Sequence, residues 1–148
     1  MARAWSLDGF CAYAMLGAMH IQNLAIVKAL VCVAWADGRV AAEEMEVIEA
    51  LLNAYQATPS EVIEVKEFAR VPRKLEDIEL TELAAGDRRI LLQHSVLITF
   101  IDGEQSESER ELIEDLKFYL RIPPAEAERI ATVAEQRAKQ MLGGSIAS

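Results

Sequence analysis

Cysteine and proline are both scarce in this chain, which has two cysteines and four prolines among 148 residues. So few cysteines exclude the class of small secreted domains that depend on many disulfides. Cys11 and Cys32 both lie in apolar helical patterns, so we expect reduced, buried thiols. Because 52% of the residues are hydrophobic and prolines are few, the composition also excludes an intrinsically disordered chain.

Basic residues and long apolar runs are scarce as well. The chain has 15 lysines and arginines against 24 acids, a net charge of -9, which argues against a nucleic-acid partner. The longest apolar stretch, 24–36, contains Lys28 and is too short to span a bilayer, so we expect no transmembrane segment. The N-terminus has a single arginine and then Asp8, so we expect a mature cytoplasmic start rather than a secretion signal.

Apolar residues recur with the helical period of 3.6 throughout the chain, and no stretch has the pattern of a strand. The sequence therefore predicts one all-α domain over 1–148, built as a duplicated bundle of seven to eight helices with two pseudo-symmetric halves, 8–72 and 73–137. Breaks at Gly, Pro and capping residues divide the pattern. The predicted helices cover residues 7–19, 23–37 (capped by Asn23), 41–55, 58–68 (capped by Thr58), 75–84, 88–101 (after a Gly86-Asp87 break), 106–120 and 124–142.

The two halves are related by a repeat with an offset of 65 residues. Each copy is an apolar helix, an Asp-Gly break and an amphipathic helix that opens with acids. A repeat of this length indicates a duplicated helical unit. We predict that the apolar positions of the second helix in each copy are core residues. The matched pairs are Asp37 and Asp102, Gly38 and Gly103, Glu44 and Glu109, Ile48 and Ile113, and Leu51 and Leu116.

The repeated turn has two interpretations. A glutamate seven residues after the aspartate matches the end of an EF-hand loop, but the earlier acids of that loop are replaced by apolar residues in both copies, so this is not an EF-hand. In a structural account, the aspartate forms an Asx turn, glycine supplies a positive φ, and Ser106 with Glu109 forms a capping box. The first copy has Ala41 where the second has Ser106, so capping explains Glu109 better than Glu44, and cation binding stays open.

The segments AWADGRVAAEEMEVIEALL and TFIDGEQSESERELIEDL resemble the tellurite-resistance TerB-like family, which includes domains attached to bacterial J-domain co-chaperones. The resemblance implies a cytoplasmic bacterial stress-response protein without enzymatic activity, whose acids bind a divalent cation. Carried to this chain, those acids are Asp37, Glu44, Asp102 and Glu109. Oxygen ligands alone favour calcium or magnesium as the cofactor. The resemblance does not imply that this chain itself confers tellurite resistance.

Other candidates for chemistry are few. The chain has no phosphate-binding glycine loop, zinc spacing or nucleophile elbow, so we predict no catalytic residues. We expect His94 to be a core or interface residue. The apolar helix 7–19 carries small residues that would suit self-association, and a protein partner is the other expectation. Three classes of function therefore remain: a metal-binding module, an interaction scaffold with acids that only cap helices, and an enzyme with a polar cleft around His94.

Overall fold

The computed structural model of this chain describes residues 21–101 and 105–147, without the side chains of residues 21, 22, 37 and 142–147. Within these residues the fold consists of six α-helices and three short 3-10 helices, with no strand. The all-α class predicted from periodicity is confirmed. The α-helices are α2 (Ile21–Ala34), α3 (Ala42–Ala54), α4 (Pro59–Ala69), α5 (Ala85–Thr99), α6 (Glu107–Tyr119) and α7 (Pro124–Ala147), and the 3-10 helices are η1 (Trp35–Asp37), η2 (Leu75–Asp77) and η3 (Leu80–Glu82).

The helix count is lower than the seven to eight predicted, for two reasons. The predicted helix 7–19 lies outside the described residues. The predicted helix 75–84 is wrong, because the chain forms η2 and η3 there. The Asp77 carboxylate accepts a hydrogen bond at 3.0 Å from the backbone N–H three residues earlier, which closes a short turn. Ile78 and Leu83 are buried and hold the segment against the core, so tertiary packing overrides the helical pattern.

The start of α5 also differs from the prediction. Gly86 and Asp87 do not break the chain before this helix but lie in its first turn, which begins at Ala85. The Asp87 carboxylate accepts a hydrogen bond from the backbone N–H of Ala84 at 2.9 Å. Asp87 therefore caps the helix from its third position rather than from the position before it.

The sequence predicts two further helix ends at the wrong residues and one at the right residue. Asn23 lies inside α2 and is not its N-cap, and α7 continues to Ala147 instead of ending near residue 142. At the start of α4, the hydroxyl of Thr58 accepts a hydrogen bond from the backbone N–H of Glu61 at 3.2 Å, and the Glu61 carboxylate accepts one from the Thr58 N–H at 2.8 Å. This reciprocal pair is the capping box that the sequence predicted.

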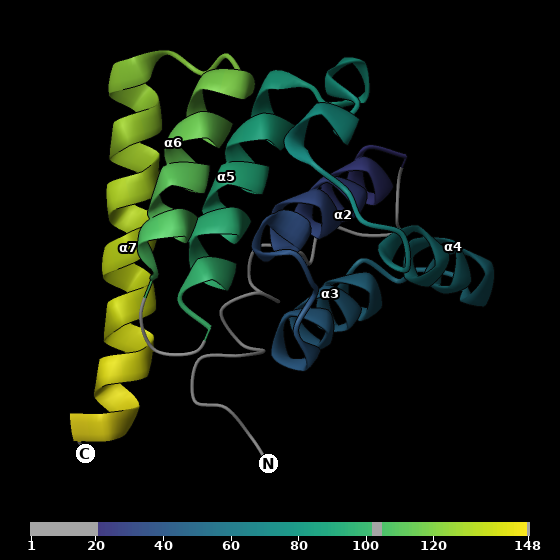
Figure 1. Ribbon diagram of the computed structural model, residues 1–148, viewed down its shortest axis with the longest axis horizontal. Helices are drawn as coiled ribbons and strands as arrows, with labels where there is room; N and C mark the ends of the chain where they lie inside the picture. Colours follow the sequence, from purple (N-terminus) through teal and green to yellow (C-terminus); the bar gives the residue numbers. More distant parts are fainter. Residues whose placement is uncertain (1–20, 102–104, 148) are drawn as a thin grey trace.

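The centre of the molecule is the contact between α2 and α5, the two apolar helices. α2 also contacts α3 and α4, while α5 contacts α6 and α7, so each apolar helix packs against the two helices that follow it. Figure 1 shows α5, α6 and α7 side by side next to the group formed by α2, α3 and α4. None of the helices in the described part of the chain has the length and apolar composition needed to cross a membrane.

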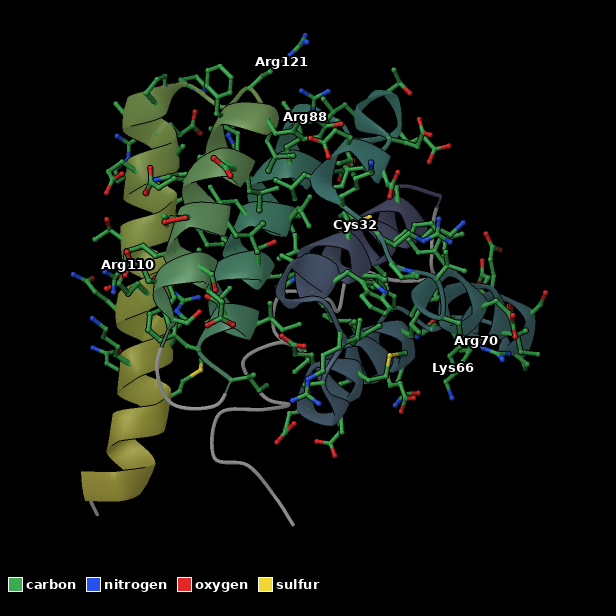
Figure 2. The ribbon with its side chains drawn as sticks, in the orientation of Figure 1. Cys32, Lys66, Arg70, Arg88, Arg110 and Arg121 are labelled. Atoms are coloured by element: carbon green, nitrogen blue, oxygen red, sulfur yellow. The ribbon has the colours of Figure 1, made fainter. Side chains whose placement is uncertain are left out.

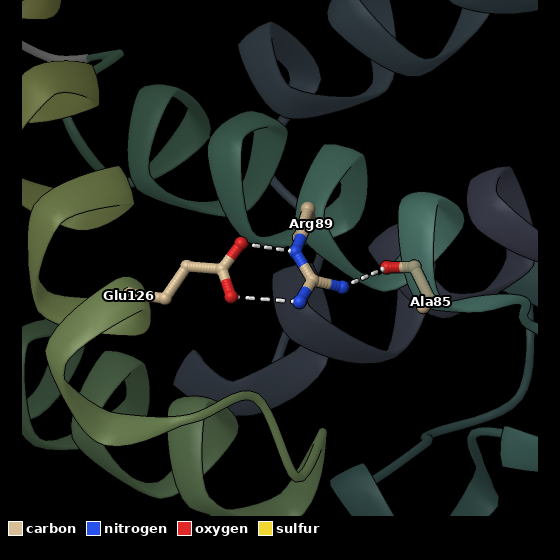
Figure 3. A network of polar contacts seen from close by, with 3 residues as sticks. All are labelled: Ala85, Arg89 and Glu126. Carbon is tan, nitrogen blue, oxygen red and sulfur yellow. Dashed lines mark hydrogen bonds and ion pairs between the residues drawn. The ribbon is translucent and has the colours of Figure 1, made fainter.

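Two neighbouring arginines of α5 form polar contacts that connect this helix to other elements of the second half. Arg89 binds the Glu126 carboxylate through two nitrogens, with Nη2 2.7 Å from Oε1, and its Nη1 donates to the Ala85 carbonyl at 2.7 Å (Figure 3). This hydrogen-bonded ion pair lowers the pKa of Glu126 and joins α5 to α7. Arg88 (Figure 2) donates to three backbone carbonyls and so joins η3 to the end of α6. Its acceptors are Leu80 at 2.9 Å, Leu83 at 3.1 Å and Leu120 at 3.1 Å.

The two halves share a backbone feature that the sequence does not reveal. Gln56, after α3, has φ 62°, and Arg121, after α6, has φ 59°, and these are the only non-glycine residues with positive φ in the described ranges. They are 65 residues apart, the offset of the repeat, and each is followed three residues later by the proline that opens the next helix. A duplicated helical unit would produce this match. The division into two halves stays a prediction, which superposing an experimental structure of α2–α3 on α5–α6 would check.

We expect Gln56→Gly to raise the free energy of unfolding by roughly 0.5–1 kcal/mol. The left-handed conformation crowds the Cβ of Gln56, and glycine removes this strain, although it loses more backbone entropy on folding. Urea unfolding of the two proteins measures the difference. As a control, Asn53→Gly in the exposed face of α3 should destabilise by roughly 0.3 kcal/mol, because its backbone is helical and glycine is a poorer helix former than asparagine. Destabilisation by Gln56→Gly would show that the left-handed conformation of Gln56 is not strained.

Candidate functional site

The candidate site consists of two acidic turns, the first over residues 37–44 and the second over residues 102–109. In the first, α2 gives way to η1, and Gly38 follows with φ 90°. The Gly38 N–H donates to the Trp35 carbonyl at 2.8 Å, which ends the helix. A Cβ at Gly38 would meet nothing within 4 Å, so the backbone conformation, not space, requires glycine here.

Glu44 is buried at the start of α3, with 6% of its surface exposed. Its Oε1 accepts a hydrogen bond from the backbone N–H of Ala41 at 2.8 Å. Ala41 is the N-cap residue and has no hydroxyl to complete a capping box. Capping therefore also accounts for Glu44, although its carboxylate caps the helix from one side alone.

Glu109 occupies the equivalent place at the start of α6 and is 7% exposed. Its Oε1 accepts from the Ser106 N–H at 2.8 Å, and its own N–H donates to the Ser106 hydroxyl at 3.1 Å. The predicted capping box of the second copy is confirmed. The repeat thus places two glutamate carboxylates in matched, buried positions, each with one oxygen bonded to an N-cap N–H.

The structure describes the two aspartates of the turns less completely than the two glutamates. The backbone of Asp37 closes η1, while its side chain is outside the description, and Asp102 lies outside the described residues. η1 contacts α6, the helix that carries Glu109, so the first turn packs against the helix that follows the second turn. The meeting of all four carboxylates stays a prediction.

The carboxylate oxygens are the potential metal ligands of the two turns. Within residues 21–101 and 105–147, apart from the side chains named above, no three His, Cys, Asp or Glu side chains lie together to hold a metal ion. Glu44 and Glu109 supply carboxylate oxygens, which are the ligands that hard divalent cations prefer. The placed residues fit calcium or magnesium in type, and the complete set includes the two aspartates.

His94, the remaining chemical candidate, lies in α5 with 0% of its surface exposed. This placement confirms the expectation of a core residue. Burial lowers the pKa of His94 from its ordinary 6.5 to about 4, so the side chain is neutral at physiological pH. A polar cleft around His94, the feature that the enzyme interpretation required, would need this side chain to be accessible.

The thiol of Cys32 is free and 1% exposed, as expected, while Cys11 lies outside the described residues. Burial raises the pKa of Cys32 to about 12, so the reactive thiolate does not form near neutral pH. Figure 2 shows Cys32 in the interior, among the helices. This cysteine is a packing residue.

Lys117 in α6 is a buried charge that sequence reasoning missed. It is 9% exposed, and its Nζ lies 2.8 Å from carboxylate oxygens of both Glu114 and Glu128. These contacts raise the pKa of Lys117 and outweigh its burial, which acts in the opposite direction. The repeat could have revealed this site. Lys117 is equivalent to Leu52 of the first copy, an apolar residue that is buried, so the repeat places Lys117 on the core-facing side of its helix.

Comparison with known proteins identifies the family. The family described as "Tellurite resistance protein TerB" matches residues 23–132, which include both acidic turns, most of α2, all of α3 to α6 and the start of α7. No curated protein and no solved structure matches the chain. The match covers well over half of the 148 residues, and it agrees with the all-helical fold. The chain therefore belongs to the TerB family.

Proposed function

We propose that this member of the TerB family is a non-catalytic, cytoplasmic stress-response protein that binds a divalent cation through its two acidic turns. The observation that carries the proposal is the matched burial of Glu44 and Glu109, which are 6% and 7% exposed in equivalent places of the two copies. Burying a carboxylate costs free energy unless charge or hydrogen bonds compensate it. The enclosure of His94 supports the non-catalytic part, because the enzyme interpretation depended on its access.

Asp37, Glu44, Asp102 and Glu109 would hold the cation. All four offer oxygen ligands, so calcium or magnesium is favoured over zinc. A bound cation would offset the mutual repulsion of the carboxylates. Because the two turns lie in different halves, a shared cation would also tie the halves together.

An interaction scaffold is the alternative function, and one observation favours it. Glu44 and Glu109 each already accept a hydrogen bond from an N-cap N–H at 2.8 Å. These bonds provide a structural reason for both residues. In this alternative the turns shape the helix ends, and a protein partner binds elsewhere.

We expect calcium or magnesium to raise the melting temperature of the wild-type protein. At a free cation concentration about 100 times Kd, mass action gives about 2.7 kcal/mol, or a rise of roughly 5–10 °C for a domain of this size. Asp37→Asn combined with Asp102→Asn should abolish the rise. The control is Glu43→Gln with Glu107→Gln, which removes the same charge from exposed positions in the first turns of α3 and α6 and should keep the rise.

A second pair of variants separates the two functions. Glu44→Gln with Glu109→Gln keeps an oxygen that accepts the N-cap hydrogen bond but removes both charges. If the turns bind a cation, this protein loses calcium binding in calorimetry while its helices stay capped. An unchanged melting temperature of the wild type at millimolar calcium and magnesium would reject the cation proposal and favour the scaffold.

A further inference from the structure

The outer face of α6 carries an aromatic side chain in water. Phe118 is 88% exposed, which exceeds the other large hydrophobic side chains on the described surface. The opposite face of the same helix is buried in the core through Leu112, Ile113 and Leu116. The described part of the fold therefore buries little of Phe118, and a contact with another surface would remove its apolar area from water.

The first half of the molecule shows what the fold itself needs at this position. The residues equivalent to Lys117 and Phe118 are Leu52 and Asn53 of α3. Leu52 is buried and Asn53 is exposed, the usual distribution for a surface helix. The second half has the opposite polarity, with a charged residue inside and an aromatic residue outside. Helix packing does not require this inversion.

Phe118 stands between two hollows of the surface. One, of about 630 Å³, lies at the turn from α6 to α7 and includes Arg121, Ile122 and Pro124 in its lining. The other, of about 550 Å³, lies where η1 and residues 73–76 meet α6 and includes Trp35 and Leu75. Phe118 lines both hollows, so a projecting ring and the recesses that could receive such a ring occupy the same face.

Charge along this face reverses at Phe118. Glu114 and Asp115 precede it and are exposed, and Arg121 follows it. Figure 2 shows Arg121 at the end of α6, pointing away from the rest of the molecule. Asp115 lies one helical turn before Phe118 within α6, and Arg121 lies three residues after Phe118, just past the end of this helix. An identical helix in the antiparallel direction, centred on Phe118, would therefore bring Arg121 of each copy opposite the acids of the other.

We propose that this face, defined by Glu114, Asp115, Phe118 and Arg121, binds a second copy of the same chain about a two-fold axis. A two-fold interface must be complementary to itself, and here the ring with its hollows and the acids with Arg121 both meet that requirement. Each Phe118 packs into a hollow beside the Phe118 of the other copy. Each Arg121 approaches Asp115 and Glu114 across the axis.

Sedimentation velocity of the purified chain between about 1 and 300 µM tests the proposal. We expect a concentration-dependent dimer for the wild type. Phe118→Asn installs the residue of the equivalent position in α3 and should weaken the dimer by roughly 30-fold or more, as expected for a central aromatic contact. Ile63→Asn, a matched change at a 61% exposed position of α4, should leave the dimer unchanged. A monomeric wild type over the whole range, or a dimer unaffected by Phe118→Asn, would overturn the proposal.

Charge reversal tests the antiparallel arrangement. Asp115→Arg and Arg121→Glu should each weaken the homodimer, because each places like charges together at both ends of the interface. An equimolar mixture of the two variants should form a heterodimer, because both pairs are then attractive, and the double variant should dimerise again. Circular dichroism confirms that each variant is folded. If the mixture associates no better than the separate variants, the antiparallel contact is wrong.

Discussion

Leu116→Ala is expected to lower the free energy of unfolding by about 2–5 kcal/mol, and Leu51→Ala by a similar amount. Both side chains are 0% exposed and occupy equivalent positions of α6 and α3. Truncation removes buried methyl groups and leaves a cavity that close-packed helices fill only in part. The two costs should be of similar size if the two halves pack alike.

Urea unfolding of the three proteins measures this effect, with the slope of the transition checked for two-state behaviour. Glu111→Ala is the control, because this residue is exposed on the same helix and its change should lie within about 0.5 kcal/mol of zero. Costs below about 0.5 kcal/mol for both leucines would mean that the buried faces of α3 and α6 are wrongly assigned.

Acidification from pH 7 to pH 4 is expected to remove roughly 3 kcal/mol of stability through His94 alone. Its pKa is about 4 in the folded protein because burial disfavours the charged form, against an ordinary value of 6.5. Below pH 6.5 the unfolded chain therefore binds a proton that the folded chain does not. Stability through this residue is complete above about pH 6.5, falls as the pH drops, and levels off below about pH 4.

The measurement is the free energy of unfolding of the wild type and of His94→Gln at several pH values between 7.5 and 4. Carboxylates titrate in both proteins, so the difference between the two curves isolates His94. The ring-proton NMR signals of the only two histidines, His20 and His94, provide a direct check. If the folded protein shows a His94 pKa near 6.5, or if the two curves run parallel, the predicted loss does not occur.

Local chemistry made a large part of the fold predictable. The periodicity of apolar residues identified an all-α chain and the buried face of each amphipathic helix, including Ile48 and Ile113. The break at Gly38 and the capping boxes at Thr58 and Ser106 were predicted correctly. Each of these features depends on residues within one turn of helix, so short stretches of sequence contain the information.

The candidate site was predictable only in its positions. The repeat pointed to Glu44 and Glu109, and both are buried in matched places. It did not reveal that Glu44 caps α3 without a hydroxyl at residue 41, because that depends on the backbone geometry of the turn. The meeting of Asp37 and Asp102 with these glutamates stays a prediction.

Sequence by itself determined the helical class, the amphipathic faces, the main breaks and the family resemblance, because periodicity and capping act over a few residues. Tertiary structure alone decided the 3-10 turns over 75–84, the full burial of His94, the double ion pair of Lys117 and the exposure of Phe118. These features arise where segments far apart in the chain meet. α5 is enclosed between α2 and α7, whereas no helix in the described part of the chain covers Phe118 on the outer face of α6. The same helical pattern of apolar residues is compatible with either environment.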